Sequence, residues 1–526
     1  MNKLASIKAP KAIDTKLPHY ESLVHMFQAT IEQRPEVTAV IWNDRQITYA
    51  QFGRAVEGLR RELEALGARG SRVIIMMPNL IEMDVALMAG MAAGAQVAPV
   101  NPFFKPAELK KVLAGADPAA IICDASSKDK AEAVAEALGV ANVMTLGVGG
   151  TLIDQWTNDE TLVFAPDTLP TADDLALLIF TGGSTGIPKG VDHTHSGLVF
   201  SILQHVTVWP LEFGAEIFLN VAPMFHIWGL AYATWVPIFA QGTLVMVPKY
   251  DPDKVVMALS EHRVTVFGGG PAPIYMGALA SPLFDDADLS SMRYCLSGGA
   301  PCPEDLHREW QQRTGQPLLE GWGMTEGAPF CLNPYDGKRK VLSVGNPVPE
   351  TSIEIVDLDT GDTVLPIGEA GEVRVKGPQL MRGYRNNPEE TARTLRDGWV
   401  YTGDIGYIDD EGFVFLVDRK KDMILVGGYN VYPRDVDEVL FSHPKIREAA
   451  TVGKADPRLG EVVVAFVVLD AGQSMNDEEF FAYCQEAMVK YKRPVEVTFV
   501  DALPKTGTNK INRLALRDLV RNRPST

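Results

Sequence analysis

Short apolar runs alternate with amphipathic stretches along the first third of the chain. The runs at residues 39–42 and 72–76 have the length of buried strands, while residues 49–66 repeat apolar positions at helical spacing. Residues 94–102 are typical of a buried strand that ends in a turn, and residues 106–114 follow with a helical pattern. This alternation predicts layered α/β architecture for residues 20–170.

Farther along, apolar runs end in glycine. Residues 175–180 form one such run, and the chain continues as Thr-Gly-Gly-Ser-Thr-Gly-Ile-Pro-Lys-Gly over residues 181–190. Glycines permit tight or left-handed backbone, the hydroxyls can donate, and Lys189 supplies a cation. These features favour a polyanion, with a plain surface turn as the alternative. The segment is not a Walker A motif, because Pro188 precedes Lys189 and Gly190 follows it.

Two other glycine segments follow strand-like runs. Residues 294–297 lead into Gly-Gly-Ala-Pro, and residues 320–326 read Glu-Gly-Trp-Gly-Met-Thr-Glu. An aromatic ring between glycines can present its face to a purine, and Glu326 is a hard oxygen ligand suited to Mg²⁺. Taken alone, either segment could be a structural turn.

Three other patterns have mainly structural interpretations. Residues 264–284 carry no charge, but the glycines and prolines at 268–273 would break a membrane helix, so we expect a buried strand, a loop and a helix. His193 and His195 stand two residues apart without a second ligand cluster, and we expect polar loop or helix-start residues rather than a metal site. Residues 1–17 lack the apolar core of a signal peptide and are predicted to be a flexible lead-in.

Composition narrows the class of partner. With 526 residues, the chain is long enough for two or more domains. The net charge of -18 argues against a nucleic-acid surface and against docking on anionic lipid, which leaves small molecules as the expected partners. Five cysteines, scattered and odd in number, favour a reducing cytoplasm over a disulfide framework.

The string at residues 181–190 resembles the phosphate loop of the adenylate-forming superfamily, which includes acyl-CoA synthetases, nonribosomal peptide adenylation domains and luciferases. The segments at 320–326, 401–406 and 503–511 match further motifs of this superfamily in family order, so the resemblance covers nearly the whole chain from residue 20. Two departures are Gly182, where the family usually carries Ser, and Asn509, where it usually carries Gly.

The resemblance implies roles for individual residues. It implies a catalytic part for Lys510, Thr325, Glu326 and His226, with Thr325 on the α-phosphate, Glu326 as the Mg²⁺ ligand and His226 beside the carboxylate. It implies nucleotide or coenzyme contacts for Thr181, Gly182, Gly183, Ser184, Thr185, Gly186, Lys189, Gly298, Gly299, Ala300, Pro301, Glu320, Gly321, Trp322, Gly323, Met324, Asp404, Arg419, Lys421, Gly427 and Gly428.

The same resemblance implies the domain organisation. We expect an N-terminal AMP-binding domain of layered α/β subdomains over residues 1–417, a hinge at 418–422 and a small mobile α+β domain over 423–526. Arg419 would contact the nucleotide and Lys421 would be the pivot. Rotation would withdraw Lys510 and bring Gly427 and Gly428 into the site for thioester formation.

The implied function is that of an ATP-dependent carboxylic acid–CoA ligase that forms an acyl-adenylate and uses ATP, Mg²⁺ and coenzyme A. Phe225 and His226 supply no anion to hold an amino group, which disfavours an amino acid substrate. Glycines beside Trp228 indicate an apolar pocket, so we expect a medium- or long-chain fatty acid or a related apolar carboxylic acid. A cytoplasmic homodimer without membrane insertion is the accompanying expectation.

Alternative functions fit parts of the pattern. An aryl acid of the benzoate or cinnamate type would also suit an apolar pocket, and the acyl group could be loaded onto a carrier-protein thiol instead of coenzyme A. A nucleotide-binding protein without catalysis would account for Gly182 and Asn509. A luciferase-like oxygenase is the alternative that the sequence favours least.

Overall fold

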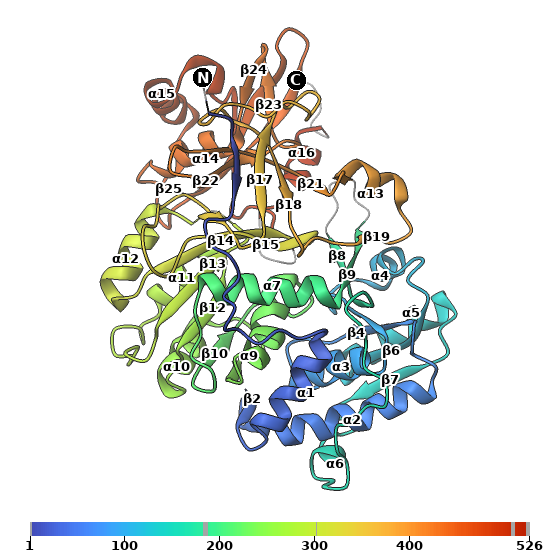
Figure 1. The fold of residues 1–526 in the computed structure, drawn as a ribbon. Helices are drawn as coiled ribbons and strands as arrows, with labels where there is room; N and C mark the ends of the chain where they lie inside the picture. The colour runs from blue at the N-terminus through green and yellow to red at the C-terminus, as the bar shows by residue number, and fades with distance from the viewer. Residues whose placement is uncertain (1–2, 182–187, 301, 507–510, 522–526) are drawn as a thin grey trace. The chain divides into compact units, whose positions relative to one another are not determined.

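The computed structural model describes residues 3–181, 188–300, 302–506 and 511–521. The chain forms two compact units. The large unit contains Ile7–Ile353 and Val375–Val400, and the C-terminal unit contains Met1–Ser6, Glu354–Arg374 and Tyr401–Thr526. Mixed α/β layers make up the large unit, which matches the predicted fold class (Figure 1).

One sheet of the large unit has the order β19-β9-β8-β5-β4-β6-β7 among the described residues. Its strands from β8 to β7 are parallel, whereas β8 pairs with β9, and β9 with β19, in antiparallel fashion. The strand bounds are β4 Arg72–Met76, β5 Gln96–Pro99, β6 Pro118–Asp124, β7 Val143–Leu146, β8 Leu175–Thr181, β9 Lys189–Thr194 and β19 Gly383–Tyr384.

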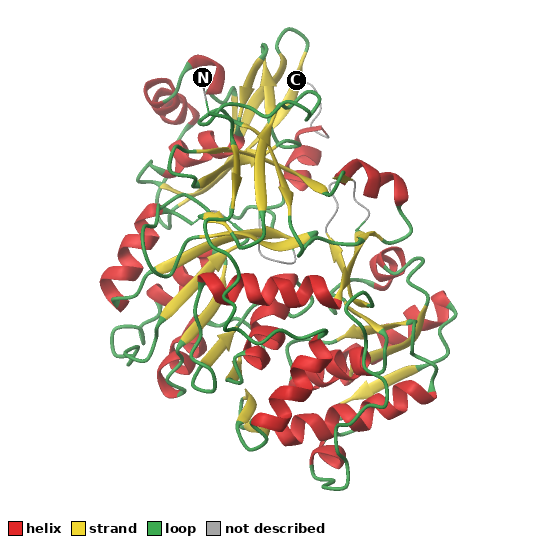
Figure 2. Cartoon of the chain, in the orientation of Figure 1, coloured by secondary structure: helices red, strands yellow, loops and turns green. Residues whose placement is uncertain are grey.

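Helices cover both faces of this sheet, as Figure 2 shows. Successive side chains of β4 point to opposite faces of the sheet. Val73 and Ile75 join the core under the α2 and α3 helices, while Ile74 and Met76 join a second core with α4 and α5. The helices of this region are α1 Leu23–Gln33, α2 Tyr49–Ala65, α3 Ile81–Ala92, α4 Pro106–Val112, the 3₁₀ turn η1 Ala125–Ser127, α5 Lys128–Leu138 and α6 Asp154–Thr157.

The second sheet of the large unit has the order β16-β15-β14-β13-β12-β10-β11-β2-β3 in the described parts of the chain. Strands from β2 to β14 in this order are parallel, and antiparallel β3, β15 and β16 extend the two ends. The bounds are β2 Thr38–Trp42, β3 Arg45–Thr48, β10 Ile217–Asn220, β11 Thr243–Met246, β12 Val266–Gly270, β13 Tyr294–Gly298, β14 Leu318–Met324, β15 Gly327–Leu332 and β16 Asn346–Pro347.

Helices α10, α11 and α12 cover one face of this second sheet, over a core that contains Phe267 and Trp310. Helix α7 contacts β15 of the second sheet and also β8 and β9 of the first, and Figure 1 shows it running across both. The helices here are α7 His195–Val208, α8 Ile227–Leu230, the π-helix η2 Ala231–Trp235, α9 Val236–Phe239, α10 Pro252–Glu261, α11 Ala272–Ala280, α12 Glu304–Thr314 and α13 Pro388–Thr394.

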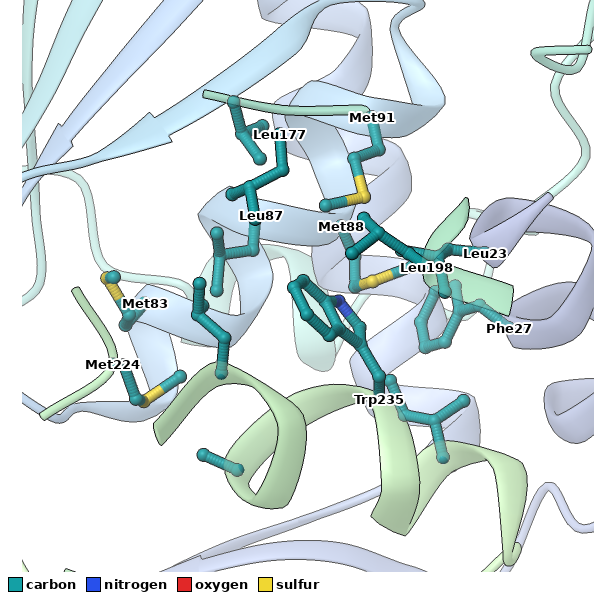
Figure 3. Packing of buried hydrophobic residues seen from close by; sticks show 14 of the residues in the cluster. Leu23, Phe27, Met83, Leu87, Met88, Met91, Leu177, Leu198, Met224 and Trp235 are labelled. Carbon is teal, nitrogen blue, oxygen red and sulfur yellow. The ribbon is translucent and has the colours of Figure 1, made fainter. Parts of the chain in front are cut away.

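The largest core of the protein is shared by the two sheets. In Figure 3 the Trp235 indole, from η2, points toward Leu87 and Met88 of α3, with Phe27 of α1 and Leu198 of α7 close by. All these residues are at least 97% buried and belong to one cluster. A tryptophan and the adaptable thioether side chains fill this junction between helices that are far apart in sequence.

The C-terminal unit contains a sheet with the order β24-β23-β26-β25, to which β27 adds beside β26. Val463 and Val467 of β26 face the core with α14 and α15, and the alternate residues Val464 and Phe466 face the core with α16. The bounds are β23 Ile424–Val426, β24 Tyr429–Val431, α14 Pro433–Phe441, β25 Ile446–Asp456, β26 Gly460–Leu469, α15 Asp477–Ala487, the 3₁₀ turn η3 Lys490–Lys492, β27 Glu496–Phe499 and α16 Arg513–Arg521.

A further sheet has the order β1-β17-β18-β21-β20, with β22 paired to β21, within the described residues. Strands β17, β18 and β21 run through the positions at which the two units divide. The bounds are β1 Ser6–Lys8, β17 Ser352–Val356, β18 Gly371–Lys376, β20 Leu395–Arg396, β21 Trp399–Ile408 and β22 Val414–Arg419. The predicted domain boundary at 417 and the hinge at 418–422 describe which part of the chain rotates. Both stay predictions.

Several sequence predictions are confirmed element by element, including the strand, loop and helix at residues 264–284. Across the described ranges no helix is both long and apolar enough to cross a bilayer. The flexible lead-in is wrong in part, because Ser6–Lys8 is a strand, and Ala5 donates its backbone N–H to the Leu365 carbonyl at 2.7 Å. His193 was expected in a polar loop or helix start but lies buried in β9, whereas Thr194 and His195 do begin helix α7.

Candidate active site

Three parallel strands of the second sheet end side by side in glycine-containing segments. Gly270, at the end of β12, pairs in register with Ser297 of β13, and Gly298 pairs with Gly321 of β14. Gly299 and Ala300 follow directly and are partly or fully exposed. Because ligands of open α/β sheets bind beyond the carboxyl ends of the strands, this edge is the expected place for a site.

Thr325 and Glu326 form the two-residue turn of the β14–β15 hairpin, since Met324 pairs in register with Gly327 on either side of them. Glu326 is only 6% exposed. Its backbone is fixed from a distant part of the chain, because Met381 donates its N–H to the Glu326 carbonyl at 2.8 Å. The turn therefore presents a hydroxyl and a carboxylate at the strand ends in a defined position.

The first sheet reaches the same turn through His193 of β9. His193 Nε2 lies 2.7 Å from the Thr325 carbonyl oxygen. Burial lowers the pKa of His193 to about 4, so the ring is neutral at physiological pH. The carbonyl can only accept, and Nε2 must therefore carry the proton and donate it. The bond joins the strand after the phosphate loop to the turn that carries Glu326.

The predicted phosphate loop lies in the sequence between two antiparallel strands. Thr181, the last residue of β8, pairs in register with Lys189, the first residue of β9. The Lys189 ammonium forms an ion pair with Glu390 of α13 and lies 4.8 Å from the centre of the Tyr384 ring. The Tyr384 phenol in turn donates to Glu326 Oε1 at 2.5 Å. Lys189 and Glu326 are thus connected through one tyrosine.

The segment around Tyr384 is attached to β9 by its backbone. Gly383 and Tyr384 pair with Asp192 and Val191 in the β19–β9 ladder, and Arg385 donates its N–H to the Gly190 carbonyl at 2.8 Å. The Arg385 guanidinium also forms an ion pair with Asp192 at 3.0 Å. Sequence reasoning missed that Tyr384 reaches Glu326.

The glycines of the strand-end segments have a packing reason of their own. A Cβ at Gly321 would lie 2.5 Å from Leu332 Cδ2, and a Cβ at Gly298 would lie 2.6 Å from the Trp228 ring. Trp322 is 8% exposed and packs edge-on against Phe330, with ring centroids 5.1 Å apart. Gly323 and Met324 continue the strand, and a Cβ at Gly323 would lie 2.8 Å from Ala328 Cβ.

Glu320 faces α12 at this edge. Its Oε2 lies 3.1 Å from His307 Nε2, and the Cys302 thiol is the third member of a compact group. Burial raises the pKa of the Cys302 thiol, and the Glu320 carboxylate raises it further. The thiol therefore stays protonated, and the short contact makes Glu320 a partner of His307 in this structure.

His226, which the resemblance implies lies beside the carboxylate of the acid, caps helix α8. The Trp228 N–H donates to His226 Nδ1 at 3.4 Å, and the Trp228 indole donates to the Gly268 carbonyl at 3.1 Å. The Trp228 ring also packs on Tyr232, with centroids 4.8 Å apart. A Cβ at Gly229 would lie 2.0 Å from the Pro223 carbonyl, so only glycine fits there. Besides the half-buried His226, this wall has polar atoms in the Trp228 indole and in the Tyr232 hydroxyl, which lies 3.1 Å from His205 Nδ1.

In the C-terminal unit, two residues predicted to hold the nucleotide contact each other. Asp404 of β21 and Arg419 of β22 are register partners, and Arg419 Nε lies 2.6 Å from Asp404 Oδ1. Asp404 is buried, whereas the Arg419 side chain is 46% exposed. Lys421 is exposed, and its carbonyl accepts a hydrogen bond from Arg517 Nη1 of α16 at 3.0 Å.

Gly427 and Gly428 form the turn between β23 and β24, where Val426 pairs with Tyr429. Their φ angles are +58° and +86°, values that glycine adopts without strain. The turn is exposed at both glycines. Other residues of the predicted site lie outside the described residues, namely Gly182, Gly183, Ser184, Thr185, Gly186, Pro301 and Lys510.

The donor set of the large unit fits a magnesium–nucleotide complex. A carboxylate has about four acceptor positions, so the bond from Tyr384 leaves Glu326 with capacity for a hard cation. Lys189 is the first residue of β9, directly after the predicted phosphate loop, where it can meet phosphate oxygens. Glu326 would hold Mg²⁺, and Lys189 together with Thr325 would contact phosphate.

Comparisons with known proteins agree with this arrangement. The chain is 35% identical to a long-chain-fatty-acid–CoA ligase of Bacillus subtilis (strain 168), over 92% of this chain and 91% of that protein. It is 37% identical to a feruloyl-CoA synthase of Amycolatopsis sp, over 91% and 94%. The crystal structure of ATP-bound MatB from Rhodopseudomonas palustris matches with a TM-score of 0.88 and 32% identity, over 95% and 99% of the two chains.

The fold is that of the adenylate-forming enzymes. The family model for AMP-binding enzymes matches residues 27–385, and the model for their C-terminal domain matches residues 435–510. The chain belongs to the AMP-binding enzyme family, and within it to the adenylate-forming acyl-CoA synthetases.

Proposed function

We propose that the acid joined to coenzyme A by this AMP-forming acid–thiol ligase is a medium- or long-chain fatty acid or a related apolar carboxylic acid. The supporting observation is the wall at residues 226–232, where the indole of Trp228 and the ring of Tyr232 pack together. Both lie near the glycine ends of β12 and β13, and such a surface suits an apolar acyl group.

The reaction uses ATP, Mg²⁺ and coenzyme A. A carboxylate oxygen attacks the α-phosphorus of ATP, the bond to the β-phosphate oxygen breaks, and pyrophosphate leaves. The thiol of coenzyme A then attacks the acyl carbon, and AMP leaves with the oxygen that came from the acid. Mg²⁺, when bound, neutralises charge on phosphate oxygens.

The chain's own residues would manage the negative charge of both steps. In the proposed roles, Lys189 and the phosphate loop hold the polyphosphate, Thr325 donates to the α-phosphate and Lys510 stabilises the charge that spreads over carboxylate and phosphate oxygens. Asp404 would accept from the ribose hydroxyls. Arg419, which contacts Asp404 here, would keep that carboxylate oriented.

The two-state use of the C-terminal part is also proposed. Residues 418–422 would be the hinge, with Lys421 as the pivot, and the turn at Gly427 and Gly428 would enter the site for thioester formation. The exposure of that turn and of Lys421 supports the proposal, because neither is held in a core.

An aryl acid is the second candidate. A flat indole that packs at the wall suits an aromatic acid as well as an aliphatic one, and the feruloyl-CoA synthase of Amycolatopsis is 37% identical to this chain.

A cytoplasmic location and a homodimer complete the proposal. The five free cysteines, all buried, fit a reducing compartment.

A panel of acids tests the substrate. AMP and thioester would be measured with ATP, Mg²⁺, coenzyme A and fatty acids of graded length, branched acids, and benzoate- and cinnamate-type acids. A preferred fatty acid with thioester product is the expected result. Preference for an aryl acid would favour the second candidate. Accumulation of adenylate without thioester would indicate that the acyl acceptor is a carrier-protein thiol and not coenzyme A.

A further inference from the structure

Glu326 and Lys189 belong to different sheets, and one side chain touches both. Tyr384 donates its phenol proton to Glu326 Oε1 at 2.5 Å, and its ring lies 4.8 Å from the Lys189 ammonium. Tyr384 and Glu326 are each 6% exposed, so the hydrogen bond between them is made away from bulk solvent. A hydrogen bond to a charged acceptor is stronger in such surroundings than in water.

The position of Tyr384 is fixed independently of Glu326. Its backbone pairs with Val191 in the β19–β9 ladder, and its N–H donates to Thr391 Oγ1 at 2.9 Å. Met381, three residues earlier, holds the Glu326 carbonyl. The segment from Met381 to Tyr384 therefore hydrogen-bonds both the backbone and the side chain of Glu326.

A carboxylate offers only acceptors, so the phenol is the donor in its bond to Glu326 Oε1. A metal-binding carboxylate that is oriented in this way keeps one oxygen directed by the protein.

We propose that Tyr384 is a positioning residue that orients the Glu326 carboxylate toward the cation of the ATP complex and sets its distance from Lys189. The inference rests on the proposed function in that Glu326 is taken as the magnesium ligand. Outer partners of metal ligands commonly change metal affinity 10- to 100-fold when they are removed. Tyr384 would thus control how much Mg²⁺ the enzyme needs, without contacting the acid.

The test is Tyr384→Phe, which keeps the ring beside Lys189 and removes the oxygen. Binding of an ATP analogue with a methylene bridge between the α- and β-phosphorus would be measured by calorimetry across a MgCl₂ titration. We expect the Mg²⁺ concentration at half-maximal binding to rise about 10-fold. Because the readout is binding, it does not depend on which acid the enzyme takes.

Tyr49→Phe is the matched control. Tyr49 is 1% exposed in the same unit, and its hydroxyl donates to the Gly242 carbonyl at 2.8 Å. This variant also loses a buried phenol bond, so it reports the general cost, and we expect its Mg²⁺ dependence to match the parent protein. Thermal midpoints of both variants verify that they are folded.

A double-mutant cycle separates positioning from general destabilisation. If Tyr384 acts through Glu326, Tyr384→Phe should change Mg²⁺ dependence little in a Glu326→Gln background. An unchanged Mg²⁺ requirement in Tyr384→Phe, or an equal effect in both backgrounds, would overturn the inference. Absence of acid-dependent pyrophosphate release from the parent protein would instead count against the proposed function, while the binding measurement would still decide the role of Tyr384.

Discussion

Lys189, the first residue of the strand after the phosphate loop, forms an ion pair with Glu390 of helix α13. Each side chain is 22% exposed, so solvent screens the pair only in part. In the role proposed for Lys189, a triphosphate would need the same ammonium group. The Glu390 carboxylate would then compete with ATP for Lys189.

Glu390→Gln should tighten the binding of ATP. Removing the competing charge is worth about 1 kcal/mol for a partly exposed pair, which corresponds to about a fivefold lower dissociation constant. Calorimetry with a non-reactive ATP analogue measures it at low salt. Glu389→Gln, an exposed neighbour on the same helix, is the control. Weaker binding in Glu390→Gln would show that the pair instead holds Lys189 in its working position.

Lys510→Ala should depress adenylate formation about 100-fold or more, because a cation is removed from developing charge. Thioester formation from supplied acyl-adenylate should change much less. Lys505→Ala is the control, since Lys505 lies five residues earlier and pairs with Glu448 at 3.1 Å. Rapid-quench measurement of each half-reaction checks the difference. Equal losses in both half-reactions would remove the catalytic role from Lys510.

Gly428→Leu should slow thioester formation and leave adenylate formation nearly intact. The φ angle of +86° makes any side chain there costly by about 1 kcal/mol. Gly472→Leu matches this strain, because Gly472 has a φ of +78° and, like Gly428, has no atom within 4 Å of an added Cβ. Normal thioester formation in Gly428→Leu would contradict the proposed entry of this turn into the site.

Asp84→Asn should stabilise the large unit at alkaline pH. Asp84 is buried in α3 and accepts from Thr234 Oγ1 at 2.6 Å, and burial raises its pKa to about 8. In the unfolded chain the pKa of this carboxyl is about 3.9. Between these values the folded state holds a proton that the unfolded state has lost, so the free energy of unfolding falls as pH rises.

The substitution removes this titration and keeps an acceptor for Thr234. The gain in the free energy of unfolding should be about 2–5 kcal/mol larger at pH 8 than at pH 5. Thermal midpoints of the variant and the parent protein at the two pH values report this difference. Asp129→Asn is the control. Asp129 lies in the first turn of α5, as Asp84 lies in the first turn of α3, but Asp129 is exposed whereas Asp84 is buried. Equal pH dependence in Asp84→Asn and the parent protein would show that Asp84 is ionised in the folded state.

Local pattern was enough to predict much of the fold. The run at residues 175–180 became β8, and residues 49–66 became α2, because apolar period and flanking turns act over a few residues. The glycine ends of β12, β13 and β14 were also visible in the sequence. Their side-by-side register was not, since strand order depends on pairings between distant segments.

The contacts that complete the candidate site are long-range. Lys189 and Glu390 are 201 residues apart, and Tyr384 and Glu326 are 58 apart. Nothing in the local sequence of Glu390 marks it as a partner of the phosphate loop. His193 stands between the polar residues Asp192 and Thr194, so its local sequence did not mark it as a buried strand residue. Its bond to Thr325 requires two sheets to meet.

The path of the carboxylate oxygen tests the central claim most directly. The preferred acid, labelled with ¹⁸O in both carboxylate oxygens, would be converted with ATP, Mg²⁺ and coenzyme A, and the products analysed by mass spectrometry. Attack on the α-phosphorus predicts AMP with one ¹⁸O, a thioester that keeps the other and unlabelled pyrophosphate. AMP without label, or label in pyrophosphate or phosphate, would contradict an acyl-adenylate route.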